Sequence, residues 1–254
     1  MTAATGGESS YPEFGALAEL TALAGARNFA DWIVDQFEPH LDGDVLDVGA
    51  GLGTISLRIA ERHPSARITA LEPAPNVYPR LVANTDGHVT IAPRQHGSAD
   101  WHRECDDRVG DDSVLYDTVL YVNVLEHVRA DASELRSARD LLRPDGVLGL
   151  CVPAMPSLYG EIDRISGHHR RYRRDELADL VRAAGFRIDR IHHLDALGVA
   201  PYWFTYRLLG VRHVSGSSTA LYDRVLVRIG RRLERTFGPP SVGKNLIVVA
   251  RRTD

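Results

Sequence analysis

One polar stretch of the chain carries side chains suited to acid–base chemistry. Residues 161–172 read EIDRISGHHRRY, and within them His168 and Tyr172 are four positions apart. In a helical turn that spacing would place both side chains on one face. A histidine exchanges protons near neutral pH, and a tyrosine can orient an acceptor oxygen or shield a reacting group. The pattern predicts His168 and Tyr172 as catalytic residues.

The same stretch offers two carboxylates and an arginine. Glu161 is a third predicted catalytic residue, and either Glu161 or Asp163 could act as the base in place of His168. Arg171 carries a planar fork of donors that suits an anionic or polyhydroxylated ligand, which predicts a substrate-binding role. The alternative is a basic turn that enters a helix, with its arginines paired to the two carboxylates.

A glycine cluster marks a second candidate site. Residues 45–54 read VLDVGAGLGT, so Gly49, Gly51 and Gly53 directly follow an apolar run that contains Asp47. Such clusters form tight turns or allow a ligand to approach the backbone closely. The dinucleotide fingerprint G-x-G-x-x-G fails because Thr54 stands at its third glycine, and the Gly-Lys-Ser/Thr ending of a phosphate-binding loop is absent. The competing cofactor is S-adenosylmethionine, which has no phosphate.

Such a cofactor also needs an acidic residue for its ribose hydroxyls. Glu72 ends the apolar run ARITALEP at the appropriate place, and both its oxygens can accept from a diol. We therefore expect Glu72 to be open to the pocket, so that its loss would weaken cofactor binding and hardly change the stability of the free protein. Asp47 could instead hydrogen-bond the turn behind it, which is a structural role.

Apolar runs and helical patterns alternate across residues 44–153. Strand-like runs occupy 44–51, 66–73, 89–95, 116–128 and 147–153, and helical segments separate them at 54–63, 76–86 and 131–142. This alternation predicts an α/β fold, namely a Rossmann-like, doubly wound, mostly parallel sheet with helices on both faces. Ligands bind such sheets at the carboxyl ends of the strands, where the glycine cluster and the 161–172 segment would both lie.

The flanking regions complete one predicted domain over residues 11–254, after a disordered N-terminus at 1–10. One or two amphipathic helices are expected within 14–37, a helix over 173–186, a strand over 187–195 and a closing strand over 243–252. The acceptor side should come from 14–40 and 154–215. Within it, the aromatic stretch APYWFTYRLLG at 200–210 is either an apolar cover over the acceptor or a helix packed on the sheet.

Composition excludes several classes of function. The net charge of −4 over 254 residues argues against a nucleic-acid binder, and no apolar run approaches the ~20 residues of a membrane span. The two cysteines, Cys105 and Cys151, lack metal or disulfide spacing, which favours a reducing, cytoplasmic location. No His/Cys/Asp/Glu cluster has metal-ligand spacing, so no metal is expected. Glu126 is interpreted as a solvated or capping carboxylate. Homo-oligomerisation stays open.

Taken in order, these pieces resemble the class I S-adenosylmethionine-dependent methyltransferases, from NFADWIVDQF to VVARR. The resemblance implies that fold and that cofactor. It matches HGSAD to the loop that borders the adenine of the cofactor in this family, although the family often has Asp where this chain has Ser98. It matches VNVLEHV to the loop that lies along the cofactor. The implied cofactor-binding residues are Asp47, Gly49, Gly51, Gly53, Glu72, Ser98, Ala99 and Asn123.

Two further strings, RNFADWI and GHHRRY, resemble a bacterial subgroup found beside glycan or secondary-metabolite pathways. That resemblance implies methyl transfer to a small-molecule acceptor, with Asn28, His127 and Arg171 on the acceptor side. Sugars, phenols, prenyl diphosphates and lipid-linked glycans all stay open as acceptors. The alternative function is a cofactor-binding, non-catalytic partner subunit of the same fold. A nicotinamide oxidoreductase is disfavoured by Thr54.

Overall fold

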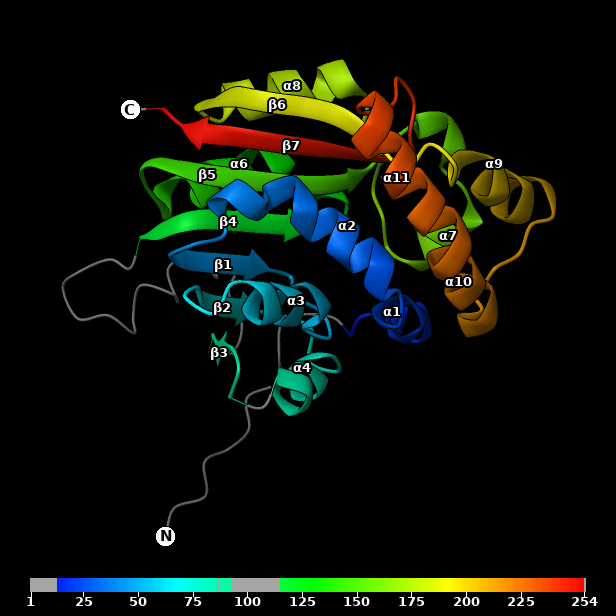
Figure 1. Ribbon diagram of the computed structural model, residues 1–254, viewed down its shortest axis with the longest axis horizontal. Coiled ribbons are helices and arrows are strands. Elements are labelled where there is room, and N and C mark those ends of the chain that lie inside the picture. Colours follow the sequence, from blue (N-terminus) through cyan, green and yellow to red (C-terminus); the bar gives the residue numbers. More distant parts are fainter. Residues whose placement is uncertain (1–12, 86, 93–114, 254) are drawn as a thin grey trace, which may run out of the picture.

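The computed structural model describes residues 13–85, 87–92 and 115–253, and in these residues seven strands form one sheet (Figure 1). The spatial order is β3-β2-β1-β4-β5-β7-β6. Strands β1 to β5 pair in parallel, whereas β7 is antiparallel to both of its neighbours. The strands are β1 Asp44–Val48, β2 Arg67–Leu71, β3 Thr90–Ile91, β4 Tyr116–Val122, β5 Leu142–Pro153, β6 Phe186–Leu194 and β7 Asn245–Arg252.

Helices cover both faces of this sheet, which confirms the doubly wound fold. In Figure 1, α2, α3 and α11 lie in front of the sheet, and α6 and α8 lie behind it. Two apolar clusters of buried residues follow this division, one including α2 and α3 and the other α6 and α8. The helices are α1 Leu17–Ala24, α2 Arg27–Phe37, α3 Thr54–Arg62, α4 Tyr78–Thr85, α6 Asp131–Asp140, α7 Glu161–Ile165, α8 Arg174–Ala183, α9 Val199–Tyr202, α10 Gly216–Tyr222 and α11 Arg228–Phe237.

The central strands are apolar on both sides because both of their faces are buried. In β4, Val119 and Tyr121 belong to the cluster with α6 and α8, whereas Leu120 between them belongs to the cluster with α2 and α3. Successive side chains of a strand point to opposite faces, so a buried parallel strand needs a continuous apolar run. The runs in the sequence predicted these strands for that reason.

Two local expectations are wrong. The fifth strand, expected at 147–153, begins earlier, because β5 starts at Leu142 and continues through Asp145, which adopts a φ of 62° where the pairing with β4 shifts register. Residues 168–172 are also not helical, because α7 ends at Ile165 and Tyr172 forms a parallel bridge with Ala154. His168 and Tyr172 therefore do not share a helical face.

The chain between β6 and β7 consists of helices. The π-helical segment η4 Trp203–Leu208 continues α9, and the π-helical segment η5 Asp223–Val227 joins α10 to α11. Short 3-10 turns are η1 Glu38–His40, η2 Leu125–His127 and η3 Pro156–Leu158. No helix in the described ranges is long and apolar enough to span a bilayer. The predictions made for residues 1–10, Ser98, Ala99 and Cys105 lie outside the described residues.

Candidate active site

The glycine loop between β1 and α3 depends on its glycines for conformation and for space. Gly49, Gly51 and Gly53 all have left-handed backbones, with φ of 66°, 58° and 81°. A Cβ on Gly49 would lie 2.6 Å from a methyl group of Val124, and one on Gly53 would lie 2.8 Å from Thr85. Side chains are excluded from both positions, so the loop stays bare at the carboxyl edge of the sheet.

Asp47 is a buried residue that stabilises the turn from the glycine loop into α3. Its carboxylate is buried and accepts a 2.5 Å hydrogen bond from the hydroxyl of Ser56, in the first turn of α3. Burial raises the pKa of Asp47 to about 6, against the opposing effect of the Ser56 hydrogen bonds. This is the turn-stabilising role that the sequence left open, and a direct role of Asp47 toward the cofactor stays a prediction.

Glu72 holds the loop from the next strand. One carboxylate oxygen accepts from the Gly51 N–H at 2.9 Å and the other from the Ala74 N–H at 2.8 Å. Burial raises the pKa of this carboxyl, and the two backbone hydrogen bonds oppose that shift. Glu72 is buried, so the expectation that it is open to the pocket is wrong, and its two backbone hydrogen bonds argue against the expectation that its loss would hardly change stability. Each oxygen retains a further lone pair, so the ribose contact is chemically possible and stays a prediction.

The loop after β4 opens beside the glycines. Asn123, the first residue beyond that strand, is exposed and has a left-handed φ of 54°. Its N–H donates to the Cys151 carbonyl at 2.8 Å, which ties the loop to β5. The close approach of Val124 to Gly49 places this loop directly against the glycine loop. The bare glycines, Glu72 and Asn123 therefore lie along one edge of the sheet, and their predicted role in binding the cofactor stays a prediction.

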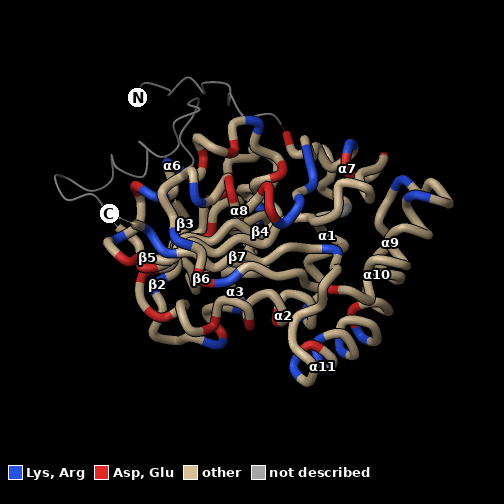
Figure 2. Tube along the Cα trace, turned by 90° about the horizontal axis from the view of Figure 1, so that it is seen from above, with Lys and Arg blue, Asp and Glu red and all other residues tan. Residues whose placement is uncertain are grey.

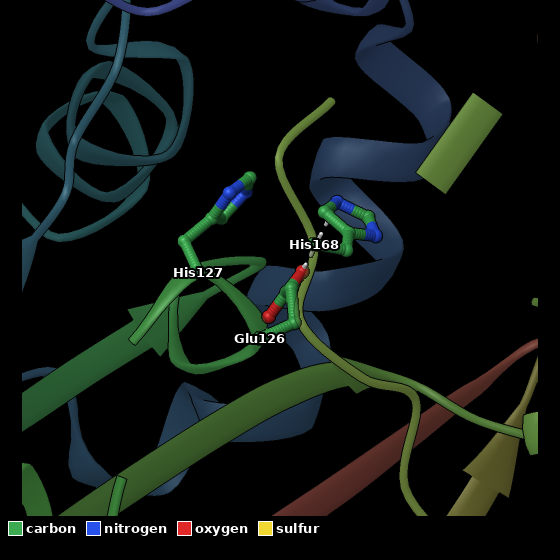
Figure 3. A group of neighbouring side chains, drawn as sticks. All are labelled: Glu126, His127 and His168. Carbon is green, nitrogen blue, oxygen red and sulfur yellow. Dashed lines mark ion pairs between the residues drawn. The ribbon is translucent and has the colours of Figure 1, made fainter. Parts of the chain in front are cut away.

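Immediately beyond Asn123, three titratable side chains converge (Figure 3). Glu126 and His127 come from η2, and His168 comes from the segment after α7. One ligand atom of each lies within 4.8 Å of the others, and Glu126 Oε1 is 4.0 Å from His168 Nε2. The structure thus joins His127 and His168, two residues that the sequence singled out for separate reasons.

Glu126 is the member of this group whose role the sequence did not reveal. It is 0% exposed, and neither of its carboxylate oxygens has a hydrogen-bond partner among the described residues. Burial raises its pKa to about 7, although the nearby His168 lowers it. The interpretation of Glu126 as a solvated or capping carboxylate is therefore wrong. Its position at the carboxyl end of β4, next to His127, is the feature of the sequence that could have indicated a site residue.

His168 is held by a second buried carboxylate. Asp163 Oδ1 lies 3.0 Å from His168 Nδ1, and Asp163 also accepts from the Gly160 N–H at 2.8 Å and from Arg171 Nε at 2.8 Å. Burial alone would raise the pKa of Asp163, but the His168 hydrogen bond and the Arg171 charge outweigh it and lower the pKa. Asp163 stays ionised and fixes the imidazole of His168.

Arg171 is part of this framework. Its guanidinium is buried, and besides Asp163 it donates to the Ala154 carbonyl and to the hydroxyl of Tyr202. The guanidinium carbon also lies 4.6 Å from the centre of the Tyr202 ring. The structure gives Arg171 a scaffold role, and its role as an acceptor anchor stays a prediction. Tyr202, which ties α9 to the site, lies in the aromatic stretch 200–210 that the sequence singled out, although no separate role was predicted for it.

Three other predicted site residues are not brought into this group. The hydroxyl of Tyr172 contacts the Leu125 carbonyl and Asp131, so it is directed toward α6. Glu161 is partly exposed and is paired with Arg164, which lowers its pKa. Asn28 donates to Asp223 at 2.6 Å and lies at the start of α2. Their catalytic or binding roles stay predictions.

His127 lies under the N-terminal segment. Its ring centre is 4.7 Å from that of His168 and 5.8 Å from that of Phe14, both in edge-on geometry. Burial lowers the pKa of His127 to about 3, so the ring is neutral. Phe14 exchanges two backbone hydrogen bonds with the amide of Asn76, and Leu20 of α1 lies over Gly51. The N-terminal residues therefore cover both candidate sites.

In the described part of the chain, the trio in Figure 3 is also the group of side chains that could hold a metal ion. The separations of up to 4.8 Å between ligand atoms exceed the ~3.3 Å expected when a zinc ion binds two ligands at about 2.1 Å. The sequence-based prediction of no metal stays a prediction.

Known proteins resemble this chain over most of its length. The model of a methyltransferase-domain family matches residues 21–191. Trans-aconitate 2-methyltransferase of Streptomyces avermitilis is 30% identical over 159 residues, 62% of this chain and 56% of that protein. Ubiquinone biosynthesis O-methyltransferase of Methylocella silvestris is 30% identical over 116 residues, 45% of this chain and 42% of that protein. The chain thus spans about half the length of these curated relatives.

Solved structures agree on the fold. A phosphoethanolamine N-methyltransferase 2 from Haemonchus contortus, in complex with S-adenosylhomocysteine, superposes with a TM-score of 0.60 at 12% identity. The match covers 94% of this chain and 58% of that one. The strand order, the bare glycine loop and the family match agree with one another. The chain belongs to the class I S-adenosylmethionine-dependent methyltransferases.

Proposed function

We propose that this protein methylates a hydroxyl oxygen of a small-molecule acceptor, with His168 as the general base. One observation carries the proposal. His168 is held through Nδ1 by the ionised Asp163, while its Nε2 faces the unpartnered carboxyl of Glu126 at 4.0 Å, beside the loop that meets the glycines. A histidine oriented by a carboxylate at one nitrogen is prepared to accept a proton at the other.

The residues divide the work. Bound S-adenosylmethionine supplies an electrophilic methyl group, and the glycine loop, Glu72 and Asn123 are the residues that would hold it. His168 Nε2 would take the proton that the acceptor hydroxyl must lose. Asp163 is a positioning residue that fixes the imidazole of His168. Arg171 keeps Asp163 ionised. Phe14 lies against His127 and Leu20 lies over Gly51, where both would exclude water from the site.

The curated relatives support an oxygen acceptor. One is named for methylation of trans-aconitate and the other is named an O-methyltransferase. We extend the proposal to bacterial secondary or glycan metabolism in the cytoplasm, on the resemblance of the GHHRRY string. A non-catalytic partner subunit is the competing function. Such a subunit would have no use for a histidine held between two buried carboxylates.

The test measures release of S-adenosylhomocysteine with a panel of acceptors that contains a phenol, a sugar and trans-aconitate. His168→Ala should lower turnover about 100-fold or more, with the cofactor Kd from calorimetry unchanged. Asp163→Asn should lower kcat less and shift its pH profile. Glu176→Gln, an exposed change on α8, is the control.

The outcomes separate the alternatives. Normal turnover by His168→Ala would overturn His168 as the base, and a loss in Glu161→Gln would transfer the role there. Cofactor binding without product from any acceptor would favour the non-catalytic subunit. Loss of wild-type turnover on dialysis against EDTA would replace general-base chemistry by metal-assisted chemistry at the trio in Figure 3.

A further inference from the structure

The C-terminal helical run is fixed against the protein by its inner face. Residues 216–237 form one continuous helix through α10, η5 and α11, about 30 Å long. Asp223 is buried and accepts from the backbone N–H groups of Asn28 and Phe29 at the start of α2. A Cβ on Gly230 would lie 2.8 Å from the Trp32 ring, which shows how closely the two helices pack. The rotation of this helix about its axis is therefore set.

The outer face of the same helix is apolar. Every fourth residue along it is a large hydrophobic side chain with substantial exposure, reaching 67% at Leu221 and 80% at Phe237. Side chains four apart share one helical face. The stripe, called here the outer stripe, consists of Leu221, Val225, Ile229, Leu233 and Phe237.

A row of arginines follows the outer stripe. Arg224, Arg228 and Arg232 are exposed, are spaced four apart, and each precedes a stripe residue by one position. Blue arginine positions recur along α11 in Figure 2. The two acidic residues of the helix are turned inward, since Asp223 is buried and Glu234 accepts from the Asp195 N–H. The outer surface of this helix is thus apolar and cationic.

The preceding segment adds to this surface. In Figures 1 and 2, α9 lies next to α10. The segment from α9 to the following loop exposes Trp203, Phe204, Leu208 and Leu209, and Arg207 and Arg212 are exposed beside them. Among the described residues, nine of the thirteen exposed large hydrophobic side chains lie between positions 203 and 237. Such concentration marks an interaction surface rather than scattered apolar residues.

We propose that this surface docks the protein on an anionic phospholipid bilayer. A helix with an apolar stripe and flanking arginines lies in the plane of the membrane interface, where its apolar side chains enter the acyl boundary and the guanidinium groups reach lipid phosphates. A tryptophan beside it suits the headgroup level. The molecule as a whole is acidic, with a net charge of −4. Attraction to anionic lipids would therefore come from the local cluster of arginines on this surface rather than from the net charge.

A second copy of the chain fits this surface less well. A two-fold interface presents the same patch on both partners. The arginine row would then face another arginine row or apolar residues. Of the two carboxylates of this helix, Asp223 is buried, and Glu234 is partly buried and accepts from the Asp195 N–H. Like charges that face each other without partners oppose association.

The test measures co-sedimentation of the full chain with vesicles of phosphatidylcholine alone or with 30% phosphatidylglycerol added, a fraction of roughly the anionic content that membranes use for such attraction. The wild type should bind only the anionic vesicles, and less at higher salt. The double variant Arg224→Gln, Arg232→Gln should bind roughly 30-fold more weakly, which is about 2 kcal/mol at 1.4 kcal/mol per tenfold. Ile229→Glu with Leu233→Glu should abolish binding.

The control variant Arg80→Gln, Arg136→Gln removes the same charge from exposed positions on α4 and α6 and should bind like the wild type. Far-UV spectra check that each variant is folded. The proposal is overturned if the wild type fails to sediment with anionic vesicles, or if the control weakens binding equally. It is also overturned if light scattering without lipid finds a dimer that Ile229→Glu with Leu233→Glu dissociates.

Discussion

The two halves of the candidate site are built by different means. The cofactor side is shaped by main-chain geometry, since three left-handed glycines form a bare loop and Glu72 accepts a hydrogen bond from one of its amides. The acceptor side is shaped by side-chain charges, since Asp163 gathers His168, Arg171 and the Gly160 N–H around one buried carboxylate. The cofactor side therefore tolerates few side chains in its loop. The function of the acceptor side depends on the protonation states of its residues.

This difference sets how each half should fail. In the glycine loop, a substitution acts through space and φ, so its effect should be nearly independent of pH. In the acceptor half, removing one member of the network leaves the others buried without a partner, so its effect should depend on pH. The following variants test that contrast, from the largest expected effect to the smallest.

Gly51→Val should abolish measurable cofactor binding, by more than about 100-fold, while the far-UV spectrum stays that of a folded α/β protein. Valine is strained at a φ of 58°, and its Cβ would lie 3.3 Å from Leu20, in the space expected for the cofactor. Calorimetric titration with S-adenosylmethionine measures the effect at pH 6 and pH 8, and the loss should be equal at both.

Gly87→Val is the matched control for that variant. Gly87 has a φ of 80°, but a Cβ added to it would meet no atom within 4 Å, so valine there carries the backbone strain without the steric conflict. It should lower stability and leave cofactor binding intact. Normal binding by Gly51→Val would reduce the glycine loop to a structural turn.

Glu72→Ala should lower both the stability of the free protein and its affinity for the cofactor. The variant removes two charge-assisted hydrogen bonds to backbone amides. Each is worth roughly 1.5–3 kcal/mol, so we expect the free energy of unfolding without cofactor to fall by about 3–6 kcal/mol. Urea unfolding of the free protein measures this, and titration measures the accompanying loss of cofactor affinity. If stability falls and affinity for the folded protein does not, Glu72 only supports the loop.

The contrast also explains how much could be predicted from sequence. Continuous apolar runs predicted β1, β2 and β4, because strands buried on both faces need them, and the spacing of the glycines predicted the loop. Glu126 and Asp163 were not recognised as buried members of one network, because their neighbours come from segments about forty residues apart in the chain. The outer stripe has the spacing of a core-facing helix, and only the packing of Gly230 on Trp32 shows which side faces outward.

The smallest effect in this series concerns Glu126 and is one of stability with pH. The pKa of Glu126 is about 7 in the folded protein, against 4.5 for an unburied glutamate. As pH rises above 4.5 the unfolded chain ionises first, so wild-type stability should fall until the pH passes about 7 and then level off. The loss is at most about 3 kcal/mol. Since glutamine does not ionise, Glu126→Gln should exceed the wild type by up to that amount at pH 8.

At pH 5 the same comparison should give less than about 1 kcal/mol, because that pH is only half a unit above the unfolded-state pKa of 4.5 and the folded Glu126 is still protonated. Urea unfolding at both pH values measures the difference, and Glu176→Gln, exposed on α8, should show no such pH dependence. A variant that is less stable than the wild type at pH 8 would mean that Glu126 is ionised in the folded protein. An ionised carboxylate with no hydrogen-bond partner needs a cation, so that result would favour a metal site over general-base chemistry at the group in Figure 3.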